Sequence, residues 1–166
     1  IAPSRVVLTS ELSGRTAAFR VAEIRPQVDG IITERLFEEG AAVKAGDPLY
    51  QIDPASYQAA VDSARAALAR AEAGVDVARL DERRYADLVR TNATSRQNYD
   101  NAVAVLKQAQ ADVASAKASL AAAQINLDRA RILAPISGRI GRSSVTQGAL
   151  VNANQAMALA SIQQLD

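Results

Sequence analysis

Side chains that could carry enzyme chemistry are scarce in this 166-residue chain. It has no cysteine and no histidine, which removes thiol nucleophiles, imidazole bases and the commonest zinc ligands. Carboxylates are present, but they show no spacing typical of a paired general acid and base, as at Glu38, Glu39, Asp62 and Asp81. The sequence therefore predicts a protein without catalytic activity, cofactor or metal centre.

The charges are balanced and dispersed along the chain. Nineteen basic and eighteen acidic residues give a net charge of +1, and no block of like charge could follow a phosphate backbone. Nucleic acid is therefore not an expected partner. No stretch approaches the roughly 18 apolar residues that a membrane span needs. The first residues, Ile1 to Ser4, are neither a signal peptide nor a lipidation site, so we expect any membrane anchor to lie outside this chain.

Alanine dominates the hydrophobic residues, which make up 49% of the chain and include only two phenylalanines, four tyrosines and no tryptophan. Alanine is the best helix former, and its small side chain lets two backbones approach closely. This composition favours long, thin helical packing over a broad core filled with aromatic side chains.

The segment from Pro54 to about Arg90 has the pattern of a coiled-coil helix. Apolar or small residues recur in alternating steps of four and three, which is typical of a heptad seam. The seam consists of Tyr57, Val61, Ala64, Leu68, Ala71, Val75 and Ala78, and continues through Glu82, Tyr85 and Val89. Gly74 lies within this helix, either as a flexible point or as a glycine without dynamic meaning.

A second seam runs from Tyr99 to Ala130. Its large positions lie seven residues apart and alternate with alanines: Tyr99, Leu106, Val113, Leu120 and Leu127 with Ala102, Ala109, Ala116, Ala123 and Ala130. The short link over residues 91–94 allows only an antiparallel return. The sequence therefore predicts a two-helix coiled-coil hairpin over residues 54–131, with an arm of roughly 55 Å.

The expected helix ends carry capping residues. The pair Asp53–Pro54 reads as an N-cap followed by proline at the first helical position. Thr94 or Ser95 should cap the second helix. Because Pro135 follows the last periodic residues, we expect that helix to end near Arg131.

Two segments outside the hairpin resemble each other. Gly30 to Gly40 matches Gly138 to Gly148 in length, and equivalent hydrophobic residues recur at Ile32 and Ile140 and at Val43 and Val151. Turn residues separate short apolar runs in both segments, as expected for β-strands. Neither segment has enough apolar surface to fold alone.

We therefore predict an α+β fold. Residues 23–53 and 132–166 are expected to pack as two halves of one small β-sandwich, with the long antiparallel hairpin inserted between them. Residues 1–22 are expected to be a strand or linker that belongs to an adjoining β-barrel domain.

The two halves also resemble a known domain. The runs Pro26–Ile32, Glu39–Gly40 and Leu49–Asp53 resemble the first half of the lipoyl domain of periplasmic adaptor, or membrane fusion, proteins. Ala134–Gly141 and Gly148–Val151 resemble its second half. The order of half domain, hairpin and half domain is similar to that of the AcrA and MexA type, which serves resistance-nodulation-division (RND) efflux pumps.

This resemblance implies a structural function. Such adaptors link an inner-membrane RND-type drug transporter to a TolC-like outer-membrane channel, and they associate side by side, as hexamers in the assembled pump. It also implies a periplasmic protein that is held at the inner membrane by an N-terminal anchor outside this chain. The family's β-barrel and membrane-proximal domains do not fit in the remaining residues.

Adaptors of this family contact the channel at the hairpin tip, through an arginine, a leucine four residues later and a serine eleven residues after the arginine. These positions hold Arg84, Leu88 and Ser95. Arg84 and Leu88 also extend a helical stripe from Val77 and Leu80 that lies off the seam. From the residues alone, Arg84 could equally be a solvated charge, Leu88 peripheral packing and Ser95 a helix cap. The resemblance favours contact roles for Arg84 and Leu88, and both roles for Ser95.

Two other functions remain as alternatives. A lipoyl or biotinyl carrier needs a lysine on the turn that joins the two half domains, but the hairpin replaces that turn. The three lysines are Lys44, Lys107 and Lys117, and the last two lie within the predicted hairpin. The second alternative is an adaptor of a type I secretion or ABC-type exporter, which shares the architecture.

Overall fold

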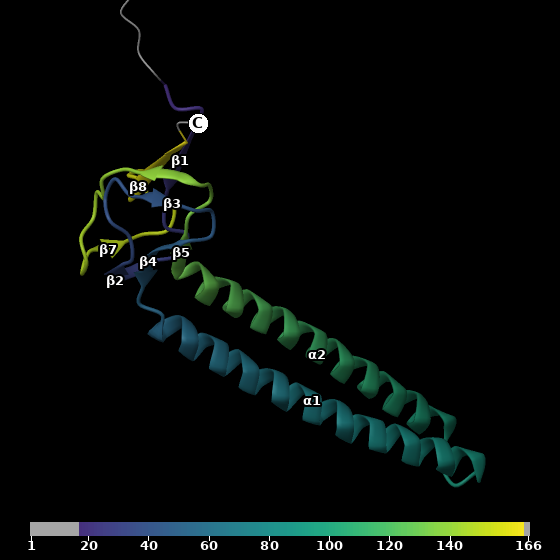
Figure 1. Cartoon of the computed structure of the whole chain (residues 1–166). Coiled ribbons are helices and arrows are strands. Elements are labelled where there is room, and N and C mark those ends of the chain that lie inside the picture. Colours follow the sequence, from purple (N-terminus) through teal and green to yellow (C-terminus); the bar gives the residue numbers. More distant parts are fainter. Residues whose placement is uncertain (1–16, 165–166) are drawn as a thin grey trace, which may run out of the picture.

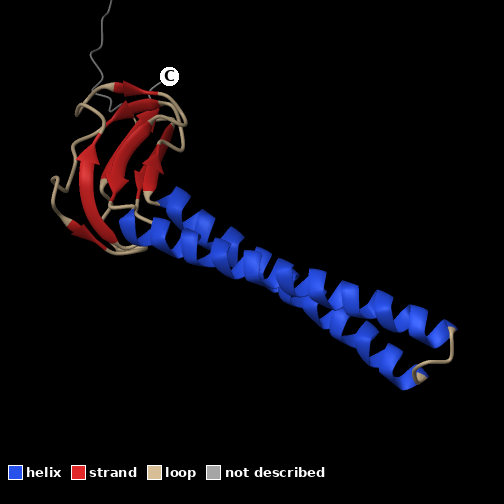
Figure 2. Cartoon of the chain, turned by 90° about the horizontal axis from the view of Figure 1, so that it is seen from below, coloured by secondary structure: helices blue, strands red, loops and turns tan. Residues whose placement is uncertain are grey.

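The computed structural model describes residues 17–164, which form two small β-sheets and one long helical hairpin (Figure 1). The elements are β1 (Arg20–Ile24), β2 (Gly30–Arg35), β3 (Ala42–Val43), β4 (Pro48–Ile52), α1 (Ala55–Arg90), α2 (Arg96–Arg129), β5 (Arg131–Leu133), β6 (Gly138–Ile140), β7 (Leu150–Val151) and β8 (Ala160–Gln164). The predicted α+β arrangement, in which a hairpin interrupts a sheet region, is confirmed (Figure 2). Residues 1–16 of the predicted linker over residues 1–22 lie outside the described residues. Its last residues differ from the prediction, because residues 20–22 belong to β1 and pair with β8 in the sandwich.

Each sheet combines strands from before and after the hairpin. The strand orders are β1-β8-β6-β3 and β5-β4-β2-β7. The hairpin leaves the sandwich where β4 and β5 pair, whereas β1 and β8 lie together at the opposite end (Figure 1). Because every sheet contains two strands of each half, neither half can complete a sheet without the other.

The sequence repeat is also a structural repeat. β2 pairs with β7, and the equivalent strands of the other half, β6 and β3, pair in the same antiparallel way. The Ile32 N–H donates to the Ala149 carbonyl at 2.9 Å, and the equivalent Ile140 N–H donates to the Ala41 carbonyl at 3.0 Å. An approximate two-fold rotation therefore relates the two halves.

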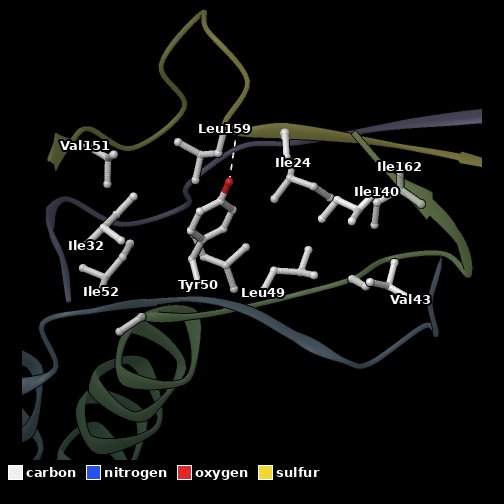
Figure 3. Close-up of a cluster of buried hydrophobic side chains, with 14 of the residues drawn as sticks. Ile24, Ile32, Val43, Leu49, Tyr50, Ile52, Ile140, Val151, Leu159 and Ile162 are labelled. Carbon is white, nitrogen blue, oxygen red and sulfur yellow. Dashed lines mark hydrogen bonds between the residues drawn. The ribbon is translucent and has the colours of Figure 1, made fainter. Parts of the chain in front are cut away.

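One hydrophobic core fills the space between the sheets (Figure 3). The Tyr50 hydroxyl forms hydrogen bonds with the Ser143 hydroxyl at 2.6 Å and the Leu159 carbonyl at 3.2 Å, and burial raises the pKa of Tyr50. Nearby, the Glu39 carboxylate accepts from the Ser143 N–H at 3.1 Å. These bonds join residues of the first half to residues of the second. The largest fully buried side chains of this core are Ile32, Leu49, Tyr50, Ile52, Ile140, Val151, Leu159 and Ile162.

The hairpin pairs the 36-residue α1 with the 34-residue α2 (Figures 1 and 2). Every predicted seam position from Tyr57 to Val89 and from Tyr99 to Ala130 is buried or half-buried, so the seam prediction is confirmed. Glu72 and Lys117 approach to 4.0 Å and lie at the same height along the arm. Among the residues of α1 and α2, the buried ones are Val61, Ala78 and Ala102. The arm is therefore long but buries little apolar surface.

The helix ends depart slightly from the prediction. The prediction of Asp53 as the N-cap is wrong by one residue, because α1 begins at Ala55 with Pro54 at the cap position. The Asp53 carboxylate nevertheless accepts from the Ala55 N–H at 3.0 Å. α2 ends at Arg129, within two residues of the predicted end near Arg131, and Arg131 already pairs with β4 in the sheet.

Two glycines should respond in opposite ways to alanine substitution. A Cβ at Gly138 would lie 2.5 Å from the Gln163 carbonyl oxygen, whereas a Cβ at Gly74 meets nothing within 4 Å. We predict that Gly138→Ala destabilises the sandwich by about 1–3 kcal/mol through steric overlap. Gly74→Ala should stabilise α1 by up to about 1 kcal/mol through helix propensity. Thermal and urea unfolding of both variants measure this, and a Gly138→Ala protein as stable as the parent would contradict the close strand approach.

Candidate docking site at the hairpin tip

The tip of the hairpin is a tight, hydrogen-bonded loop. Thr91 ends α1, and Asn92 follows with φ of 55°, a left-handed conformation that asparagine tolerates. The Ala93 N–H donates to the Leu88 carbonyl at 2.8 Å, and the Asn92 N–H donates to the Val89 carbonyl at 3.1 Å. This pair of bonds is a Schellman motif, which satisfies the last carbonyls of α1 and fixes the direction of the return.

Ser95 starts the second helix. Its backbone is extended, and its side-chain oxygen accepts from the Asn98 N–H at 3.2 Å. The predicted capping role of Ser95 is therefore confirmed, and Thr94 instead accepts from the Asn98 side-chain amide at 3.1 Å. The role of Ser95 as a contact stays a prediction.

Arg84 and Leu88 lie one helical turn apart on α1, just below this loop. The Arg84 side chain is 67% exposed and forms an ion pair with Asp81, which holds one end of the guanidinium against the helix. Leu88 is 36% exposed, so hairpin packing covers only part of it. The structure thus places Arg84, Leu88 and Ser95 together in the last turns of the arm, with unused guanidinium donors and exposed apolar area beside each other.

A shallow cleft of about 240 Å³ lies next to these residues and was not predicted from the sequence. α1 contributes Asp81 and Tyr85 to its walls, and α2 contributes Asn98, Asn101 and Val105. Val105 is 59% exposed and adds apolar area to the rim of this cleft. In the sequence, Val105 could have been noticed as an apolar residue that lies one position before the seam residue Leu106 and therefore off the seam.

The side chains at the tip are of types that bind other proteins. Within residues 17–164, no group of three or more carboxylates could hold a metal ion. Neither of the two helices is long and apolar enough to cross a membrane. Arginine donors, an aliphatic side chain and a hydroxyl on a rigid turn can bind protein carbonyls or carboxylates.

The interleaved sandwich with its inserted arm defines a barrel-sandwich hybrid domain of the membrane fusion protein class. The family described as "RND MFP, barrel-sandwich hybrid domain" matches residues 20–163. The chain belongs to this family.

Individual relatives agree with this assignment. The chain is 54% identical over 159 residues to the multidrug efflux pump subunit AcrA of Escherichia coli (strain K12), an alignment that covers 96% of this chain and 40% of AcrA. A solved MacA–MexA chimeric protein, which contains the Pseudomonas aeruginosa MexA α-hairpin domain, is 33% identical with a TM-score of 0.57, over 89% of this chain and 48% of the chimera. The chain therefore spans less than half the length of each of these two proteins.

The fold extends beyond drug efflux. The soluble domain of LipC, a membrane fusion protein of a type I secretion system, has 14% identity and a TM-score of 0.60, over 86% of this chain and 99% of LipC. At this identity the likeness concerns the fold alone.

The two roles of Ser95 can be separated by substitution. We predict that Ser95→Ala removes the cap and destabilises the first turn of α2 by about 1 kcal/mol, whereas Ser95→Asp preserves the cap. Hydrogen exchange of the amides around Asn98 measures the local stability. Equal exchange rates in the parent and in Ser95→Ala would mean that the cap contributes nothing.

Proposed function

We propose that this chain is the arm and sandwich of a periplasmic adaptor that links an inner-membrane RND-type drug transporter to a TolC-like outer-membrane channel. The observation that carries the proposal is the exposed set of Arg84, Leu88 and Ser95 at the end of the arm, in a chain of the RND membrane fusion family. The identity to a multidrug efflux pump subunit supports drug export as the process that the whole protein serves.

The mechanism is mechanical and requires no chemical step. The sandwich fixes the base of the arm, the Schellman loop fixes its tip, and a length of roughly 54 Å for α1 lets the tip reach a partner far from the sandwich. Arg84 donates to carbonyl or carboxylate oxygens at the end of the channel. Leu88 adds apolar area one turn away, and Asp81 limits the orientations that the guanidinium can adopt.

The same proposal assigns roles to the other parts of the protein. The sandwich is a lipoyl-like scaffold without an attached group, and its predicted bounds of 23–53 and 132–166 widen to include residues 20–22 of β1 and Arg131 of β5. The hairpin domain, predicted over residues 54–131, consists of α1, the tip loop and α2. The chain before β1 leads to an adjoining β-barrel domain, and an N-terminal anchor holds the protein at the periplasmic side of the inner membrane. Several copies, six in the assembled pump, stand side by side around its axis.

An adaptor of a type I secretion or ABC-type exporter is the second candidate. Its support is the shared fold of the LipC soluble domain, which shows that the architecture alone does not select the transporter. The match to the RND family favours the first candidate. The transporter that copurifies with the full-length protein from membranes decides between them.

Charge reversal at the tip tests the docking role. We predict that Arg84→Asp in the full-length protein weakens channel binding at least about tenfold, because a carboxylate replaces the donors and repels acceptors on the channel. Drug resistance should fall toward that of a strain without the adaptor. Channel pull-down, drug susceptibility and circular dichroism are measured together.

Arg70→Asp is the matched control for this experiment. Arg70 lies on α1 two heptads below Arg84 and is likewise exposed, so the variant makes the same charge change on the same helix away from the tip. This variant should keep both binding and resistance. If Arg84→Asp also keeps them with unchanged helicity, Arg84 is only a solvated charge and docking occurs elsewhere.

The scaffold role of the sandwich makes a separate prediction. The two lysines in the helices, Lys107 and Lys117, lie outside any β-turn, and Lys44 lies in the first half domain and not where the halves are joined. Intact mass of the protein from its native host should therefore equal the mass calculated from its sequence. A lipoyl or biotinyl adduct on any of the three lysines would restore the carrier hypothesis.

A further inference from the structure

The helical arm leaves the sandwich through a narrow base. β4 runs into α1 through Asp53, α2 runs into β5 through Ala130, and these two connections lie on paired neighbouring strands (Figure 1). Neighbouring strands are roughly 5 Å apart, whereas α1 is roughly 54 Å long. Two attachment points so close together hold an arm of this length weakly against rocking. A further contact away from them is needed to set its tilt.

Tyr57, in the first turn of α1, supplies such a contact. Its hydroxyl donates to the Asp29 carbonyl at 2.7 Å, and its half-buried ring packs against the hydrophobic core. Within residues 17–164, this is the only hydrogen bond that a side chain of α1 or α2 forms with the sandwich. The hydroxyl therefore adds a third point of attachment at the base.

Asp29, which receives this bond, is itself held in place. Its carboxylate accepts from the Ala153 N–H at 2.6 Å, and the Asn154 N–H donates to the Pro26 carbonyl at 2.9 Å. These bonds hold the segment between β1 and β2 against the segment between β7 and β8. Through one carbonyl, Tyr57 thus connects the arm to both halves of the sandwich.

An open cleft of about 450 Å³ lies at the base of α2. β1 and the residues after it line one wall, the last turns of α2 line a second, and β5 with the residues after it lines a third. Two apolar side chains in this lining are about half exposed, since Ile125 of α2 is 49% exposed and Leu133 of β5 is 48% exposed. The cleft leaves room for the arm to turn toward β1.

The Tyr57 bond and the cleft lie on opposite sides of the base. In the strand order β5-β4-β2-β7, Asp29 directly precedes β2, on one side of the two connections, and the cleft adjoins the edge strand β5, on the other. Rocking of the arm toward the cleft therefore draws Tyr57 away from Asp29. The same movement buries the exposed parts of Ile125 and Leu133, which favours a closed cleft.

We propose that Tyr57 is a positioning residue for the arm. Its hydrogen bond to the Asp29 carbonyl sets the tilt of the arm within the plane of the sheet and keeps the cleft beside α2 open. When the bond is absent, the arm rocks toward the cleft and the tip moves with it. Only the consequence for a channel bound at the tip rests on the proposed function.

Spin labels on the sandwich and on the arm test this role. In the full-length protein, Val21→Cys on β1 and Ala111→Cys on α2 carry the labels, at exposed positions outside the cleft. Tyr57→Phe removes the hydroxyl and keeps the ring. A turn of about 10° moves Ala111, roughly 27 Å beyond Arg129, by about 5 Å. Pulsed electron paramagnetic resonance should therefore show a mean label distance that is shorter by several Å, with an unfolding temperature close to that of the parent.

Two further variants separate the bond from other effects of substitution. Among the tyrosines within residues 17–164, only Tyr50 and Tyr57 form side-chain hydrogen bonds, so Tyr99→Phe removes a hydroxyl without a partner and is the matched control. It should keep the parent distance. Ile125→Gln combined with Tyr57→Phe should return the mean distance toward that of the parent, because a polar side chain gains less from closure of the cleft.

The proposal is overturned if Tyr57→Phe keeps the parent distance, if Tyr99→Phe changes it equally, or if the double variant shows no recovery. A large loss of thermal stability in Tyr57→Phe would also overturn it, because the hydroxyl would then be structural. The measurement involves neither the channel nor the transporter. It can therefore fail while the Arg84 experiment succeeds, and it can succeed while that experiment fails.

Discussion

The pairing of β4 with β5 is the constraint on which the rest of the structure depends. β4 leads into α1, α2 leads into β5, and Gln51 lies opposite Arg131 where the two strands meet the helices. The Ile52 N–H donates to the Ala130 carbonyl at 2.8 Å, so the end of one strand is bonded directly to the end of α2. This ladder sets the spacing and direction of both helices at their base. The seams then meet in register along the whole arm.

The base matters because the arm itself is weakly held. Alanine occupies every second seam position of α2 and three of the ten on α1, whereas helices in proteins gain most of their stability from packing rather than from propensity. Leverage adds to this dependence, since a tilt of about 5° at the base moves the end of an arm of roughly 54 Å by about 5 Å. The interleaved sheets, in which each half completes the other, give the base the rigidity that the arm lacks.

The sequence predicted the parts of the structure that follow from periodicity. The seams, the antiparallel return and the repeat of the two halves could be predicted, because heptad spacing and matched glycines can be read directly from the sequence. The end of α2 was predicted to within two residues, and the contact of Arg131 with β4 sets where the helical pattern stops.

Contacts between residues far apart in the sequence could not be predicted, because local spacing does not show which distant positions meet in the fold. The hydrogen bond between Tyr50 and Ser143 joins positions 93 residues apart, and the tip cleft requires Asn98 of α2 to lie beside Tyr85 of α1. At the tip, the capping role of Ser95 followed from local chemistry alone. The ion pair of Arg84 with Asp81 is equally local, but the sequence does not reveal which of several nearby charges forms it.

The geometry of α1 keeps its different contacts apart. Steps of four residues advance by about 40° around an α-helix, so the line from Leu80 through Arg84 to Leu88 turns from the flank of the arm toward the side that carries the tip cleft. The seam faces α2, the side of α1 that carries Leu80 faces outward, and the tip residues occupy a third direction in the last turns. Under the proposed function, a channel bound at the tip would therefore approach a different side of α1 from the one that packs on α2 or the one that carries Leu80.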